Sequence, residues 1–297
     1  MRIQTFSIVI GGTACDGACP FCVSHTTGFG PLPSVEVINV RNLRKATKFA
    51  QIGQCSTCLF TGKGEPTLYP QEIDYYLTQF QIMDNPFPFL ELQTNGLRIA
   101  SGALDDDLRR WLDQGLNTIA LSVVDVDREN NKRIYLNHRD MEYPSLAETC
   151  HRIRNLGYTI RLCVMMHRGI VDSPAGITRV VEWCKEHRIA QLTIRPLRSA
   201  SAAREDNEYA QYIRRWGLND NDIIGARQWV QNHPQATQLL TLMHGANTAN
   251  VYDVNGQNLC MSDCLTVEPS GDDIRTLIFY ADGTLTYDWQ YPGARLL

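Results

Sequence analysis

Short apolar runs rich in β-branched residues alternate along this chain with longer segments of helical periodicity. Six runs have the length and composition of strands: residues 5–10, 57–61, 89–93, 118–123, 159–166 and 190–195. Between them, apolar residues recur at helical spacing, as at Leu104, Leu108, Trp111 and Leu112, and again at Ile177, Val180, Val181 and Cys184. This order is typical of repeated strand–helix units around a parallel sheet.

Six such units are too few to close an eight-stranded barrel. We therefore expect an α/β fold in which residues 1–197 form a partial (βα)6 TIM-like barrel. Residues 198–297 would form a C-terminal, substrate-side extension or lid that covers the open side of the barrel. For this extension the pattern predicts a polar helical segment near 219–232 and a hairpin, with strands 275–280 and 284–289 joined through Asp282-Gly283.

The composition excludes several classes of protein. With 43% hydrophobic and 20% charged residues, the chain has the make-up of an ordinary soluble globular protein. Its 28 Lys and Arg residues against 32 acidic ones include no dense basic run, so we do not expect a nucleic-acid partner. The apolar run near the N-terminus is too short for a signal peptide or a membrane span, which predicts a cytoplasmic protein without membrane contact.

Ten cysteines in a chain without a secretory signal indicate metal or redox chemistry rather than a disulfide framework. Cys15, Cys19 and Cys22 lie directly after the first predicted strand, in a loop rich in small residues. Thiolates are the soft ligands that iron–sulfur clusters require, and three of them leave one iron of a four-iron cluster open to another ligand. His25 follows at a spacing that a Cys3His zinc site would also use, so zinc remains the alternative.

The spacing C-x3-C-x2-C, with Phe21 before the last cysteine, resembles the signature of the radical SAM superfamily. After the second predicted strand, residues 61–68 (TGKGEPTL) resemble the superfamily's Gly-Gly-Glu-Pro segment, which receives the methionine amino group of S-adenosylmethionine. Glycine allows a close backbone approach and a carboxylate pairs with an ammonium group, so the resemblance implies that Gly64 and Glu65 contact the cofactor. Lys63 replaces the first glycine of the segment.

The resemblance continues on the next two strands. Residues 93–96 (QTNG) are similar to a Thr-Asn-Gly sequence of the superfamily, and Ser122 lies on the fourth predicted strand. The resemblance implies that Asn95 and Ser122 contact the ribose or the methionine carboxylate at the barrel mouth. For either residue alone, a role in a turn or a helix cap is the alternative.

Residues 160–172 and 192–196 also resemble one branch of the superfamily, the GTP cyclase of molybdopterin synthesis. Arg161 falls where that branch has a basic residue near the cofactor, and a strand arginine paired with a carboxylate is the equal alternative. The branch holds a second cluster on three C-terminal cysteines. Here Cys260 and Cys264 have Asp288 near the third position, so we predict no second cluster and do not extend GTP cyclisation to this chain.

The resemblance implies an enzyme with two cofactors, a 4Fe-4S cluster on Cys15, Cys19 and Cys22, and S-adenosylmethionine. Reductive cleavage of S-adenosylmethionine would yield a 5'-deoxyadenosyl radical that abstracts hydrogen from a small-molecule substrate, with nucleotide-like molecules among the candidates. An external electron donor such as flavodoxin or ferredoxin would supply the electron. The alternatives are a peptide-modifying or glycyl-radical-activating enzyme and, more remotely, a non-catalytic zinc or iron–sulfur module.

Overall fold

A computed structural model of the chain describes residues 2–26, 37–137, 139–198, 207–243, 249–262, 273–289 and 291–297. Its central strands are β1 (Ile3–Val9), β2 (Thr57–Thr61), β3 (Phe89–Thr94), β4 (Thr118–Val123), β5 (Thr159–Met166) and β6 (Gln191–Pro196). These strands lie parallel to one another in numerical order. All six predicted strands are therefore confirmed, with ends that differ from the prediction by at most two residues.

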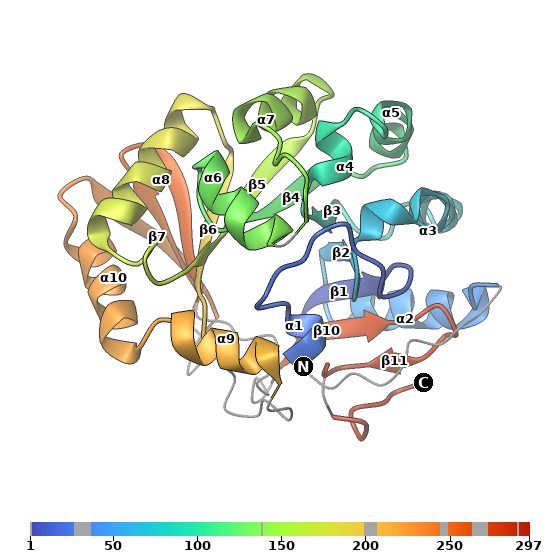
Figure 1. Cartoon of the computed structure of the whole chain (residues 1–297). Helices are drawn as coiled ribbons and strands as arrows, with labels where there is room; N and C mark the ends of the chain where they lie inside the picture. The colour runs from blue at the N-terminus through green and yellow to red at the C-terminus, as the bar shows by residue number, and fades with distance from the viewer. Residues whose placement is uncertain are drawn as a thin grey trace.

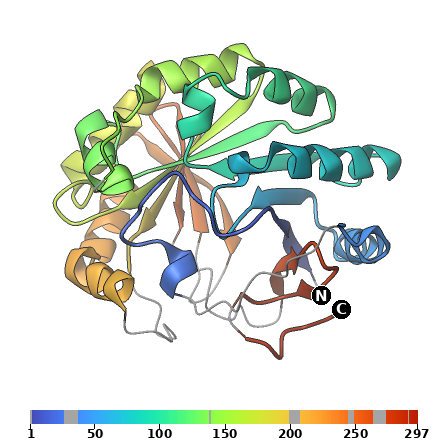
Figure 2. The same cartoon turned by 45° about the vertical axis from the view of Figure 1, so that its right-hand side comes forward.

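The described helices are α1 (Val23–Thr26), α2 (Val40–Ile52), α3 (Pro70–Ile82), α4 (Leu97–Ala100), α5 (Asp105–Asp113), α6 (Arg128–Asn131), α7 (Leu146–Asn155), α8 (Pro174–Glu186), α9 (Glu208–Trp216) and α10 (Asp220–Asn232), with short turns η1 (Pro66–Leu68) and η2 (Lys132–Leu136). Most of them cover the outer face of the sheet in an arc, whereas α1 and α9 lie together away from this arc (Figures 1 and 2). The predicted periodicity holds, because Leu108 and Trp111 of α5 and Val180 of α8 are fully buried against the sheet. Among the described helices, none is both long and apolar enough to cross a membrane.

The C-terminal third adds strands to both edges of this sheet. They are β7 (Ala236–Met243), β8 (Ala249–Val254), β9 (Gln257–Ser262), β10 (Ile274–Phe279) and β11 (Leu285–Thr286). Strand β9 pairs in parallel with β6 and is followed by antiparallel β8 and β7, whereas β10 pairs in parallel with β1. The fold is thus α/β with one large, mostly parallel sheet of 11 strands.

The predicted C-terminal hairpin is present as β10 and β11, but β11 has only two residues. The hairpin also extends the main sheet instead of standing apart from it, because the edge of β1 offers unpaired backbone groups that β10 satisfies. Strands β7 to β11 of the C-terminal third therefore extend the sheet at its two edges. Helix α9 of the same third contacts α1, which follows the loop after β1 (Figure 1).

Candidate active site

The loop that carries Cys15, Cys19 and Cys22 follows β1 at the carboxyl edge of the sheet. Burial is the main reason that the pKa of Cys15 rises to about 11, and it raises the pKa of Cys19 well above its usual value. The nearby Cys22 raises both pKa values further. In the metal-free loop the Cys15 and Cys19 thiols are therefore protonated at neutral pH, and metal binding must displace those protons.

The three thiols are not gathered around one point. Across the described ranges, no three His, Cys, Asp or Glu side chains are close enough to hold one metal ion. A four-iron cluster binds its three thiolates through three different irons, so it needs ligands spread more widely than those of a single ion. The ring of His25 stacks on Tyr209 with their centroids 4.3 Å apart. The residues present fit a cluster with soft sulfur ligands better than a Cys3His zinc site.

The loop with Gly64 and Glu65 packs directly against the cysteine loop. The backbone N–H of Glu65 donates to the carbonyl of Ala14 at 2.9 Å, and a Cβ atom on Gly64 would lie only 2.0 Å from that carbonyl oxygen. Any larger residue at position 64 would push the two loops apart. The sequence suggested that Gly64 allows a ligand to come close to the backbone. In the structure, Gly64 allows the cysteine loop to come close.

The Glu65 carboxylate is 3% exposed and joins the ends of β2 and β3. It accepts hydrogen bonds from the Thr67 N–H at 3.0 Å, the Thr67 hydroxyl at 2.7 Å, the Thr94 hydroxyl at 2.7 Å and the Asn95 N–H at 2.9 Å. Burial raises the pKa of Glu65, although these four hydrogen bonds oppose that shift. The sequence predicted the carboxylate but gave no sign of this network, because its donors come both from η1 and from the end of β3, almost 30 positions further along the chain.

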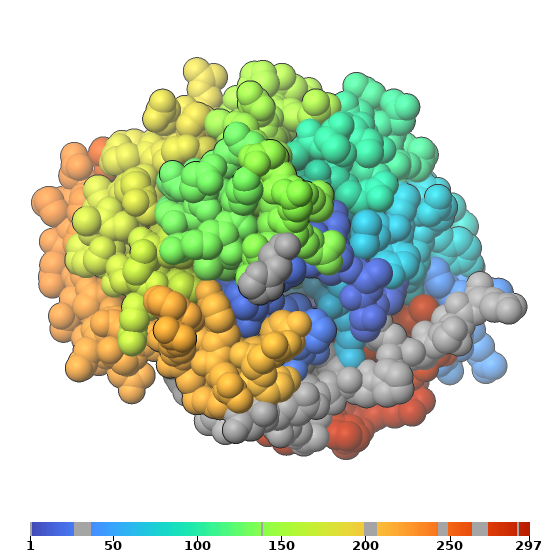
Figure 3. Space-filling view, in the orientation of Figure 1, coloured from blue at the N-terminus to red at the C-terminus, as the bar shows by residue number. Residues whose placement is uncertain are grey.

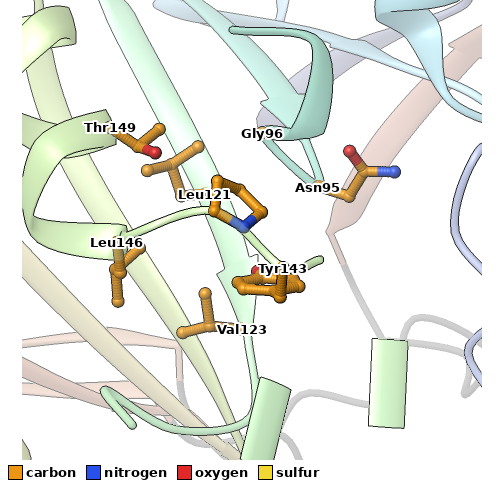
Figure 4. Close-up of a pocket in the computed structure, with 8 residues that line it drawn as sticks. Asn95, Gly96, Leu121, Val123, Tyr143, Leu146 and Thr149 are labelled. Carbon is orange, nitrogen blue, oxygen red and sulfur yellow. The ribbon is translucent and has the colours of Figure 1, made fainter. Parts of the chain in front are cut away.

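Asn95 connects the end of β3 to the cysteine loop. Its amide nitrogen lies 2.6 Å from an Asp16 carboxylate oxygen and 3.9 Å from the Cys15 sulfur. Its amide oxygen accepts from the Leu97 N–H at 2.9 Å, so the turn role considered from the sequence is also present. Figure 4 shows the amide directed away from a pocket lined by Leu121 and Tyr143, whose volume of about 10 Å³ holds one water molecule at most. The Asn95 amide therefore points to the cysteine loop and not into that pocket.

Of two further predicted site residues, Phe21 lies within the cysteine loop and Ser122 lies on β4. Phe21 packs edge-on against Tyr135, with ring centroids 6.1 Å apart, and lies 6.5 Å from Tyr212 of α9. Ser122 is half-buried on β4, in register with Cys163 of β5. Within the described chain its hydroxyl has no hydrogen-bond partner, which leaves it available to a ligand.

Helix α9 from the C-terminal third lies beside the N-terminal segment that carries the cysteine loop (Figure 3). Besides the stacking of Tyr209 on His25, the hydroxyl of Tyr212 shares a 2.8 Å hydrogen bond with Nε2 of His167. His167 is 2% exposed, stacks on Trp216 of the same helix and follows directly after β5. Aromatic residues on α9 thus bridge the cysteine loop and the end of β5. The sequence could not show this, because these residues belong to no motif and lie almost 200 positions from the cysteines.

Arg161 forms a salt bridge with Glu91, and the Gln93 amide donates to the same carboxylate at 3.1 Å. The Glu91 side chain is 2% exposed and that of Arg161 is 26% exposed. The structure therefore shows the alternative considered from the sequence, a strand arginine paired with a carboxylate. Contact between Arg161 and the cofactor stays a prediction.

Replacing Arg161 with Met would leave the Glu91 carboxylate buried without its cation. We expect the free energy of unfolding to fall by about 2 kcal/mol, measured by urea denaturation. The double variant Arg161→Met with Glu91→Gln should recover most of that loss, because it removes the unpaired charge as well. A single variant as stable as the wild type would show that the pair contributes nothing.

Cys260 lies on β9, in register with Thr193 of β6, while Cys264 lies outside the described residues. No disulfide joins two of the nine described cysteines. We predict that Cys260 and Cys264 hold no second four-iron cluster, because two thiolates supply too few ligands. Electron paramagnetic resonance and iron analysis of a variant without Cys15, Cys19 and Cys22 test this. About four irons retained there, and lost on mutating Cys260 and Cys264, would contradict the prediction.

The loop with the three cysteines, the loop with Glu65 and the end of β3 with Asn95 thus meet at the carboxyl edge of a parallel α/β sheet. A family model described as the Radical SAM superfamily matches residues 9–184. The chain therefore belongs to the radical SAM superfamily, and its cofactors are a 4Fe-4S cluster and S-adenosylmethionine. A comparison with curated proteins finds no match.

Several solved structures share the fold. SuiB from Streptococcus suis aligns with a TM-score of 0.59 and 14% identity, over 96% of this chain and 60% of SuiB. The protein anSMEcpe, with bound AdoMet and the Cp18Cys peptide, aligns with a TM-score of 0.51 and 19% identity, over 75% of this chain and 57% of that one. Methylornithine synthase (PylB) aligns with a TM-score of 0.51 and 12% identity, over 77% of this chain and 62% of PylB. The matched regions thus span about three fifths of these proteins, and identities this low show the fold alone.

Proposed function

We propose that this chain is an enzyme that holds its cluster on Cys15, Cys19 and Cys22 and binds S-adenosylmethionine beside Glu65 and Asn95. The observation that carries the proposal is the convergence of three loops. The Glu65 N–H bonds to Ala14 in the cysteine loop, and the Asn95 amide lies 3.9 Å from the Cys15 sulfur. When bound, the two cofactors supply a carbon radical that abstracts hydrogen from the substrate.

The chain's own residues would orient these groups and exclude water. The three thiolates would hold the cluster, and the Glu65 carboxylate would pair with the methionine ammonium group from a position fixed by its four hydrogen bonds. Gly64 and Phe21 would border the cofactor, with Ser122 at its ribose side. Helix α9, with Tyr209 and Tyr212, would shield the site from solvent.

We retain residues 1–197 as a partial (βα)6 barrel and residues 198–297 as the substrate-side part of the enzyme. The substrate is a small molecule in this proposal, with an external donor such as flavodoxin or ferredoxin supplying electrons. Cysteines that form no disulfide with one another, as the nine described ones do not, suit the reducing cytoplasm. A peptide substrate is the second candidate, because the anSMEcpe structure of similar fold contains a bound peptide. No contact or motif of the described residues favours glycyl-radical activation, GTP cyclisation or a zinc module over these two.

The test is anaerobic reconstitution followed by reduction in the presence of S-adenosylmethionine, with 5'-deoxyadenosine measured by chromatography. We expect cleavage that depends on the reductant and is accelerated by the correct substrate. Parallel screens of small molecules and of short peptides separate the two candidates. Protein that binds iron but never cleaves S-adenosylmethionine would contradict the proposal.

A further inference from the structure

One face of the sheet, opposite the helices, carries a row of polar and charged side chains on neighbouring strands. Strand register places Arg161 opposite Gln191, Cys163 opposite Thr193 and Met165 opposite Arg195. Because alternate residues of a strand point to the same side, the side chains of Arg161, Cys163 and Arg195 share this inner face. Arg195 is the member of the row nearest the carboxyl end of β6.

The two arginines of this face differ in their partners. Arg161 is neutralised by the buried Glu91, as described above. Arg195 is half-buried, its Nε atom is buried without a hydrogen bond, and no ion pair joins it to any described residue. Burial raises the pKa of Cys163, and the charge of Arg195 is the largest influence that lowers it again. The charge of Arg195 therefore acts on this face. A partly buried guanidinium without an anion is costly unless a ligand supplies one.

We propose that Arg195 binds an oxyanion group of the substrate, a carboxylate or a phosphate, on the inner face between β5 and β6. The planar guanidinium presents paired donors that match both groups. The inference rests on the proposed function, because it names a chemical class for the substrate of that same site.

The position of Arg195 separates this role from binding of the cofactor. The Glu65 network ends on β3, and β4 and β5 lie between β3 and β6. Three strand spacings amount to roughly 14 Å along the sheet. The amino and carboxylate groups of the methionine end are attached to one carbon atom. If Glu65 binds the ammonium group, Arg195 starts three strands away from it, and we assign the arginine to the substrate.

The experiment compares reconstituted wild-type protein with Arg195→Gln and with the control Arg109→Gln, which removes an exposed arginine of α5. Thermal unfolding is followed at constant ionic strength while one of four anions is titrated. Inorganic phosphate and pyrophosphate form the phosphate arm, and succinate and citrate form the carboxylate arm. We expect a saturable rise in Tm for the wild type and the control, absent in Arg195→Gln. The arm that saturates at lower concentration identifies the group.

Two results would overturn the inference: no saturable response in the wild type, or the same response in Arg195→Gln. A loss of S-adenosylmethionine affinity of about tenfold or more in Arg195→Gln would also overturn it, by assigning the arginine to the cofactor. Without anions, Arg195→Gln should be as stable as the wild type, because no described partner is lost. Normal iron content and S-adenosylmethionine binding in these samples would leave the proposed function standing even if the inference failed.

Discussion

Removing the three thiols of the cysteine loop is expected to abolish iron binding and all cleavage of S-adenosylmethionine. The wild type should bind about four irons per chain after anaerobic reconstitution, and the variant with Cys15, Cys19 and Cys22 changed to Ala should bind almost none. The reason is that these thiolates are the proposed ligands of the irons. Cys15 and Cys19 are also partly buried, so water is a poor substitute for them as a ligand. Iron analysis, visible absorption and 5'-deoxyadenosine release measure the loss.

The control is Cys163→Ala, which removes one half-buried thiol from the inner face and leaves the cysteine loop intact. That variant should keep its iron and its absorption. Circular dichroism should show the same fold in both variants, because the altered loop lies outside every described strand of the sheet. Unchanged iron content in the triple variant would place the cluster elsewhere and remove the basis of the proposed site.

Changing Glu65 to Gln is expected to weaken S-adenosylmethionine binding by ~1.5 to 3 kcal/mol, which corresponds to about 10- to 150-fold in affinity. The substitution removes the charge that pairs with the methionine ammonium group and keeps the size of the side chain. It is preferable to Ala, which would leave four hydrogen-bond donors in a buried place without an acceptor. Equilibrium binding to the reconstituted protein measures the change.

The matched control is Thr94→Val, which removes one hydrogen bond to the same carboxylate and leaves its charge in place. If Glu65 acts by pairing with the cofactor, Thr94→Val should lose much less affinity than Glu65→Gln, and both should assemble the cluster. Equal losses would show that Glu65 acts only by positioning the loops. Wild-type affinity in Glu65→Gln would remove this segment from the cofactor site.

Much of the central sheet could be predicted because its signals are local. Alternating apolar runs and helical spacing identify β1 to β6, α5 and α8 from residues that are close together in the sequence. The places of β9 and β10 could not be predicted in this way. They depend on which exposed sheet edge each strand meets, and this pairing joins residues more than 60 positions apart, as between Leu192 and Leu259.

In the candidate site, too, some features could be predicted from the sequence and others depend on the tertiary structure. The sequence by itself determined which residues can supply sulfur ligands and a carboxylate, because the spacing of Cys15, Cys19 and Cys22 and the order of residues 61–68 are short-range properties. Only the tertiary structure decided that Glu65 is held by donors from η1 and from the end of β3, and that Arg161 is neutralised while Arg195 is not. Charge pairing and hydrogen bonding across strands depend on register and on burial, and both arise only when distant parts of the chain pack together.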